Sequence, residues 1–281
     1  MARTTRRARM LSGLEYFRRC VSLCESAGLV KLDIANRCMM GHCSYYANQL
    51  TEAVAHIRRA GDEARRTGHA YGEIFAQESI GMLLASSGHD AEAQREIERV
   101  MPLARRADAR RYLIALLWSL AMTRLASGED DAARAHLEEA QSFNDQTGNS
   151  FFGAILWGGI ARAARSYDQA QGALKRGEAL LREPCLSHCH LQFHRDAIEV
   201  SLDAQAWAEA LRYAGALESY TSAEPLPWAL LVIQRARALA AIGSGKHTDA
   251  VFTSLRQLRA ELVRVGMLNA LSGVDLALAA A

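Results

Sequence analysis

A cluster of cysteine and histidine residues in the C-terminal half could bind a metal ion. Thiolates and imidazoles are ligands that zinc prefers, and a zinc site needs three or four of them around one point. Residues four apart share a helix face, but adjacent residues point about 100° apart, so one helix cannot turn two such pairs inward. Packing and helix-start hydrogen bonds are therefore favoured, and we predict no cofactor. Zinc stays the alternative if the first cysteine folds back before the helix. The cluster comprises Cys185, His188, Cys189, His190 and His194.

Two further segments contain residue types that catalysis uses, without the surrounding motif. The run 243–248, Gly-Ser-Gly-Lys-His-Thr, imitates the end of a P-loop, but Ala240 and His247 replace the glycine and the Ser/Thr that the motif requires. We predict a turn between two helices there. The run 41–44 lacks the second glycine of a nucleophile elbow, and its adjacent cysteine and histidine would splay apart on a helix. No set of converging acid, base or nucleophile is present, so we predict that the chain is not an enzyme.

The elements that position these residues follow a repeat of about 40 residues. Alanines recur at spacings of 40, 40, 37, 40 and 40, and a small residue stands twelve positions before each of them except at Ile198. Each unit predicts two antiparallel helices, such as 70–87 and 90–107, with apolar residues at i, i+3, i+4 and i+7. The recurring alanines are Ala53, Ala93, Ala133, Ala170, Ala210 and Ala250. Four residues after them stand Ile57, Ile97, Leu137, Leu174, Ala214 and Ser254. Residues expected to end helices recur at Gly28, Gly68, Asp108 and Gly148.

The twelve-residue gap from a small residue to an alanine, with an apolar residue four later, resembles the tetratricopeptide repeat (TPR). The period here is about 40 residues instead of 34, and the proline that follows the second TPR helix is missing. The resemblance implies an all-α fold, a right-handed α-solenoid of about six antiparallel helix pairs. We expect a basic, disordered arm over 1–10 and the solenoid over 11–281. The expected parts are a half repeat 11–28, repeats 30–68, 70–108, 110–148, 150–184, 186–222 and 226–265, and a terminal helix 267–281.

The C-terminal half resembles the repeat region of bacterial adenylate/guanylate cyclase-like signalling proteins. Four segments carry this resemblance: 195–199 (Arg-Asp-Ala-Ile-Glu), 207–214 (Trp-Ala-Glu-Ala with Tyr-Ala), 224–228 (Glu-Pro-Leu-Pro-Trp) and 237–240 (Arg-Ala-Leu-Ala). In those proteins a cyclase domain and an NTPase domain precede the repeats. The resemblance implies a regulatory or interaction region and brings no catalytic residue to this chain.

Repeat geometry places one set of first-helix residues on the concave side of such a stack. In the first four repeats the set is aromatic and methionine-rich, which suits a helix or peptide laid in a groove. The alternative is that a tightly curved superhelix buries these side chains in its own core. The predicted partner-binding set is His42, Tyr45, Phe75, Met82, Trp118, Met122, Phe152, Ile155, Arg162, Arg195, Glu199 and Arg235.

Composition and charge exclude several classes of protein. Half of the 281 residues are apolar and four are proline, which excludes a disordered chain and permits long helices. Six arginines against one glutamate give residues 1–19 a net charge of +5, whereas the remaining 262 residues carry 27 cations and 30 acids. A solvated arm is therefore favoured over one that binds nucleic acid or anionic lipid.

The sequence shows no targeting signal, and this observation and the cysteine spacing together indicate where the protein resides. The longest apolar run, 112–122, is far shorter than the ~20 residues that span a bilayer, and no apolar segment follows the N-terminal arginines. The six cysteines include pairs at i,i+4, which suit reduced thiols better than disulfides. We predict a cytoplasmic protein without a membrane partner.

The first helix has the register of the second member of a pair. Gly13, Phe17 and Cys20 stand 40 residues before the corresponding positions of the next such helix. The N-terminal edge is thus expected to be uncovered, as in a piece of a larger protein or in a chain that associates with itself.

We therefore predict a non-catalytic protein-interaction module that binds a partner helix, a peptide or a neighbouring cyclase or NTPase domain. The alternative is a small-molecule-sensing solenoid that regulates a signalling or transcription partner.

Overall fold

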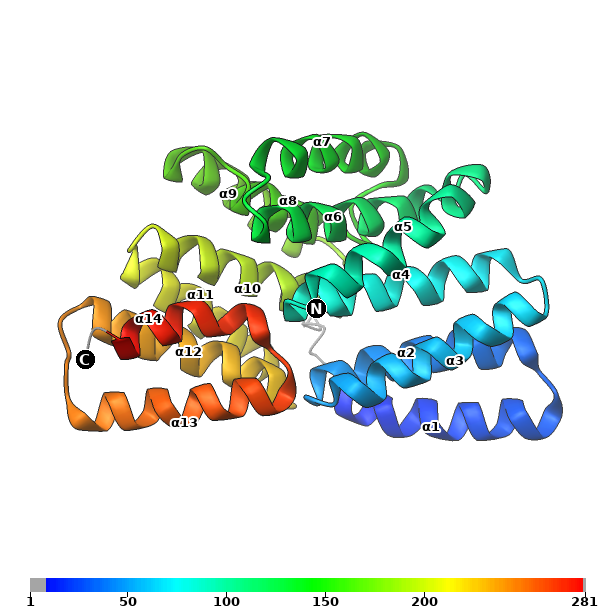
Figure 1. The fold of residues 1–281 in the computed structure, drawn as a ribbon, viewed down its shortest axis with the longest axis horizontal. Coiled ribbons are helices and arrows are strands. Elements are labelled where there is room, and N and C mark those ends of the chain that lie inside the picture. The colour runs from blue at the N-terminus through cyan, green and yellow to red at the C-terminus, as the bar shows by residue number, and fades with distance from the viewer. Residues whose placement is uncertain (1–8, 280–281) are drawn as a thin grey trace, which may run out of the picture. The chain divides into compact units, whose positions relative to one another are not determined.

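The all-α fold class is confirmed. The computed structural model describes residues 9–279, and these contain α-helices and one 3-10 helix but no strand. The expected basic arm over 1–10 lies almost wholly outside the described residues, as do the last two residues of the expected terminal helix. The helices follow one another along the chain (Figure 1). They are α1 Met10–Ala27, α2 Val30–Tyr46, α3 Leu50–Arg66, α4 Ala70–Ser87, α5 Asp90–Arg106, α6 Arg110–Ala126, α7 Asp130–Thr147, α8 Gly153–Arg162, α9 Tyr167–Leu181, α10 Ser187–Asp203, α11 Trp207–Thr221, α12 Pro227–Gly243, α13 Asp249–Val265, η1 Leu268–Ala270 and α14 Leu271–Ala279.

The described chain forms two compact units. The N-terminal unit contains 10–148 and the short segment 265–269, and the C-terminal unit contains 149–264 and 270–279. The boundary falls where the spacing of the repeat alanines drops to 37 residues. The first helix of that shorter repeat, α8, has 10 residues, whereas α6 before it has 17.

Within each unit the helices stack as the repeat predicts, except that α13 does not pack closely on α12 or on any other described helix. In the N-terminal unit, successive helices from α1 to α7 pack on one another, and the first helices of the pairs (α2, α4 and α6) also contact each other. In the C-terminal unit, α8, α10, α12 and α14 form the corresponding row. First helices therefore lie between neighbours on both sides, and second helices cover them from outside.

This arrangement explains why the two kinds of helix differ in composition. In α4, 14 of 18 residues are buried, and they occur around the whole helix circumference. In α5, only 4 of 17 are buried, on one stripe, and charged residues occupy most of the other positions. A helix that is apolar all round needs partners all round, whereas an amphipathic helix needs a single apolar neighbour.

The turns confirm the predicted punctuation at 40-residue spacing. Gly28, Gly68 and Gly148 have φ of 67°, 67° and 84°, a region that costs glycine little. Asp108 occupies the fourth position of this series with φ 46°, and its carboxylate accepts a hydrogen bond from Arg110 Nε at 2.8 Å. Aspartate is among the few other residues that tolerate this conformation, so the helix ends were readable from sequence.

Candidate functional site

The predicted concave-face side chains lie mostly in the core. Trp118 and Phe152 are 0% and 1% exposed. First helices pack directly against first helices in each unit, so residues facing along this row are covered by the next repeat. Eight residues of the set are therefore buried in the core, as the alternative expected. They are Tyr45, Met82, Trp118, Met122, Phe152, Ile155, Arg195 and Arg235. The half-buried members are His42, Phe75, Arg162 and Glu199.

The charged members of the set pair within the C-terminal unit. Arg195 donates from Nε and Nη2 to Asp196 Oδ1 at 3.1 and 2.7 Å, and Arg162 lies 3.8 Å from the same oxygen. Arg235 donates to Glu199 at 2.6 Å and to the carbonyl oxygen of Ala270 at 2.7 Å. These arginines link α8, α10, α12 and the end of η1, and their charges serve the fold.

A row of aromatic rings crosses α2, α4 and α6 in the N-terminal unit. The rings of His42 and Phe75 lie 6.4 Å apart, and those of Phe75 and Tyr112 lie 5.7 Å apart. Beside them, Ser79 Oγ lies 3.0 Å from His42 Nε2 and donates a long hydrogen bond, 3.4 Å, to the carboxyl of Glu78. Burial raises the pKa of Glu78 to about 8, so this carboxyl is largely protonated at neutral pH. Ser79 is fully buried in mid-helix, where it cannot reach a substrate.

The cysteine and histidine cluster is held by packing and by hydrogen bonds to the backbone. His188 Nε2 and Cys189 Sγ lie 2.8 and 3.2 Å from the carbonyl oxygen of Phe151. The ring of His190 stacks on Tyr220 at 4.2 Å. In residues 9–279, no group of three or more His, Cys, Asp or Glu side chains converges in a way that could hold a metal ion.

Burial also shifts the pKa values of two histidines in this cluster. It lowers the pKa of His188 to about 4, although the hydrogen bond to the Phe151 carbonyl opposes the shift. It lowers the pKa of His194 to about 3, with a smaller contribution from neighbouring His190. Both rings are neutral at pH 7, as expected for histidines that serve packing.

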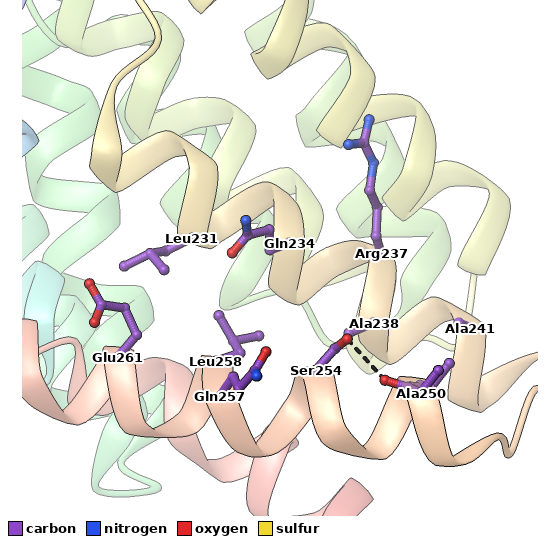
Figure 2. A pocket seen from close by; sticks show the side chains of 11 residues that line it. Leu231, Gln234, Arg237, Ala238, Ala241, Ala250, Ser254, Gln257, Leu258 and Glu261 are labelled. Carbon is purple, nitrogen blue, oxygen red and sulfur yellow. Dashed lines mark hydrogen bonds between the residues drawn. The ribbon is translucent and has the colours of Figure 1, made fainter.

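An open groove lies between α12 and α13, and sequence reasoning did not identify it (Figure 2). Its volume is about 600 Å³. Leu231 of α12 and Leu258 of α13 are its buried floor, and small residues and exposed polar side chains form its walls. The lining residues are Leu231, Gln234, Arg237, Ala238, Ala241, Ala250, Val251, Ser254, Gln257, Leu258 and Glu261. The P-loop-like run is the turn that joins these two helices, as predicted.

The repeat signature explains why this pair of helices leaves a groove. In the second repeat, a Cβ added to Gly81 of α4 would lie 2.5 Å from Ile97 Cγ1 of α5, so the isoleucine fills the space above the glycine. In α12 and α13 the corresponding residues are Ala238 and Ser254, and neither is large enough to fill that space. The signal was present in the sequence as the serine at 254, where the first four repeats have isoleucine or leucine.

Comparisons with known proteins identify no family for this chain. No protein-family model matches it, and no curated protein matches its sequence. Among the described helices, none combines the length and apolar character needed to span a bilayer.

Proposed function

We propose that this chain is a non-catalytic protein-interaction module that regulates a partner by binding one of its helices or peptides. The α12–α13 groove carries the proposal, because it exposes an apolar floor between α12, which packs on α10, α11 and α14, and α13, which packs closely on no other described helix. Grooves of this kind accept amphipathic helices through anchors spaced at i, i+3, i+4 and i+7. The concave-face residues support this function only through their half-buried members.

Site-specific photo-crosslinking in the native host tests this function. A photoreactive amino acid at Gln257, which lines the groove, is expected to give one dominant crosslinked protein. The matched control is the same amino acid at Arg256, an exposed neighbour on the same helix that does not line the groove. Equal products from both positions, or none from Gln257, would contradict the proposal. The crosslinked protein is identified by mass spectrometry and confirmed by reciprocal capture.

The second candidate function is binding of a small molecule. The groove volume of about 600 Å³ falls in the range of ligand pockets, about 300–1,000 Å³, and this observation favours the candidate. A metabolite released when the purified native chain is denatured, together with no crosslinked protein at Gln257, would support it over the first.

We further propose that the module serves a bacterial, cytoplasmic signalling protein of the cyclase-like or NTPase-like kind. The support is the resemblance of segments 195–199, 207–214, 224–228 and 237–240 to the repeat regions of such proteins. A crosslinked partner that contains a cyclase or NTPase domain is the expected outcome, and a partner of another kind would contradict this assignment.

A further inference from the structure

We infer that the α12–α13 groove binds an amphipathic helix of a partner protein, and that this helix inserts an aliphatic side chain between Ala238 and Ser254. The inference rests on the proposed function and adds the segment that is bound and the contact that selects it. Three observations support it: a pairing rule in the repeats, the exposure of signature residues in α13, and the charges on the groove rim.

The pairing rule concerns two residues sixteen apart, one on each helix of a repeat. Each of the first five pairs combines one large aliphatic residue with one small residue. The pairs are Gly41/Ile57, Gly81/Ile97, Ala121/Leu137, Gly158/Leu174 and Ile198/Ala214. The fifth pair reverses the order and keeps the complementarity, since both Ile198 and Ala214 are 0% exposed. The sixth pair, Ala238 and Ser254, has two small residues, so the rule is broken only there.

Exposure follows the rule. The signature alanines of the earlier repeats are buried: Ala53, Ala93, Ala133 and Ala210 are 0% exposed and Ala170 is 4% exposed. Their counterpart Ala250 is exposed, as is Ser254, and Ala238 is half-buried. The Ser254 hydroxyl donates a hydrogen bond to the backbone oxygen of Ala250 at 2.9 Å (Figure 2). A side chain bound in the groove therefore need not accept a hydrogen bond from this hydroxyl. The groove therefore lacks the aliphatic side chain that fills this space in the Gly41/Ile57 and Gly81/Ile97 pairs.

The walls of the groove suit a helix. Both α12 and α13 have 17 residues, which corresponds to about 25 Å of helix at 1.5 Å per residue. Ala238 and Ala241 recur at i,i+3 on one wall, and Ala250 and Ser254 at i,i+4 on the other. Small residues at these spacings leave a shallow furrow along each helix, into which the side-chain ridge of a third helix can pack.

The rim provides charge complementarity for one kind of occupant. Arg237 of α12 and Glu261 of α13 line the groove, and each already pairs with an exposed neighbour, Glu218 and Arg264. Exposed pairs contribute little to stability, about 0–1 kcal/mol, so an incoming helix can exchange them. The favoured occupant therefore has an acidic residue facing Arg237, a basic residue facing Glu261 and an isoleucine or leucine between them.

Selection from a displayed library of helical peptides tests this inference on the full chain. The library varies the aliphatic and charged positions of one helix face, and binding of enriched peptides is measured by fluorescence anisotropy. Ser254→Leu supplies the missing side chain from within and should weaken binding at least ten-fold. Thr253→Leu adds the same side chain at an exposed neighbouring position that does not line the groove, and it should leave binding unchanged.

A charge variant keeps the test independent of any rearrangement that Ser254→Leu causes. Arg237→Glu should weaken peptides with an acidic residue at the facing position at least three-fold, and a basic residue there should restore binding. Equal binding to the Ser254→Leu and Thr253→Leu variants, or no enrichment of aliphatic helices, would overturn the inference. So would retention of a small molecule in the groove, or a chain whose only occupant is a second copy of itself. If Gln257 still crosslinks a partner in any of these cases, the proposed function stands and only the site's assigned occupant is wrong.

Discussion

Gly81→Ala tests the packing rule on which the groove assignment depends. An added Cβ would lie 2.5 Å from Ile97 Cγ1, whereas carbon atoms in contact prefer about 3.5–4.0 Å, so α4 and α5 must separate or the isoleucine must leave its rotamer. Overpacking of this kind costs about 1–3 kcal/mol. Alanine gains about 1 kcal/mol over glycine inside a helix. The net expectation is a loss of about 0–2 kcal/mol in the free energy of unfolding.

Gly172→Ala is the matched control for this substitution. Gly172 lies inside α9, and no atom lies within 4 Å of the Cβ that alanine would add. Only the helix propensity then counts, and the variant should gain about 1 kcal/mol. Urea unfolding followed by far-UV circular dichroism, with hydrogen exchange to locate the change in α4 or α9, measures both.

The chain itself suggests a rescue for Gly81→Ala. The third repeat pairs Ala121 with Leu137, whose branch point is one carbon further from the backbone than that of isoleucine. Gly81→Ala combined with Ile97→Leu reproduces this pair and should recover at least half of the loss. A Gly81→Ala variant that gains stability as the control does would refute the packing rule, and with it the reason for a groove at Ser254.

Four further predictions follow from burial. Trp118→Ala should lower the free energy of unfolding by about 3–5 kcal/mol in urea titrations, because Trp118 is 0% exposed; a loss below 1 kcal/mol would contradict its place in the core. The pKa of the Glu78 carboxyl is raised from 4.5 to about 8, so the folded chain keeps a proton that the unfolded chain releases. The free energy of unfolding should therefore fall between pH 4.5 and 8, by up to about 1.4 kcal/mol per pH unit. This pH dependence should vanish in Glu78→Gln. His188, whose pKa is lowered from 6.5 to about 4, should show the opposite sign, with stability lost as pH falls from 6.5 to 4 in the wild type relative to His188→Gln. Arg235→Ala should cost up to about 3–5 kcal/mol and expose 271–279 to hydrogen exchange, because it removes a buried arginine from half-buried Glu199 and breaks the bond to Ala270; unchanged protection there would argue against this tether.

Helix number and helix ends could be predicted from sequence because local chemistry determines them. The helices expected over 70–87 and 90–107 occur at Ala70–Ser87 and Asp90–Arg106. Left-handed residues such as Gly68 and Asp108 end helices whatever their tertiary neighbours, and a repeat makes such signals recur. Apolar spacing likewise identifies the face of each helix that packs.

Burial of the concave-face set could not be predicted from the same pattern. Periodicity shows which residues face a neighbouring helix, but whether space remains between the helices depends on the side chains of both. Trp118 occupies a position that could line an open groove in a loosely wound stack, and in this structure it is fully enclosed. Arg195 and Arg235 were expected on a charged binding surface because of their charge. In the structure they form hydrogen bonds with Asp196 and Glu199 of the same chain.

The groove shows how a single rule produces both the fold and its candidate site. A repeat is stable when each large side chain meets a small one, since an unfilled space loses the contacts of every atom that lines it. The pair Ala238/Ser254 has two small residues. The chain therefore loses packing contacts, and with them stability, at this pair. Under the proposed function, a partner that supplies the aliphatic side chain would recover these lost contacts, and their free energy would then contribute to binding. A helix is the simplest supplier in this proposal, because the Gly41/Ile57 and Gly81/Ile97 pairs show that side chains on paired helices make this contact.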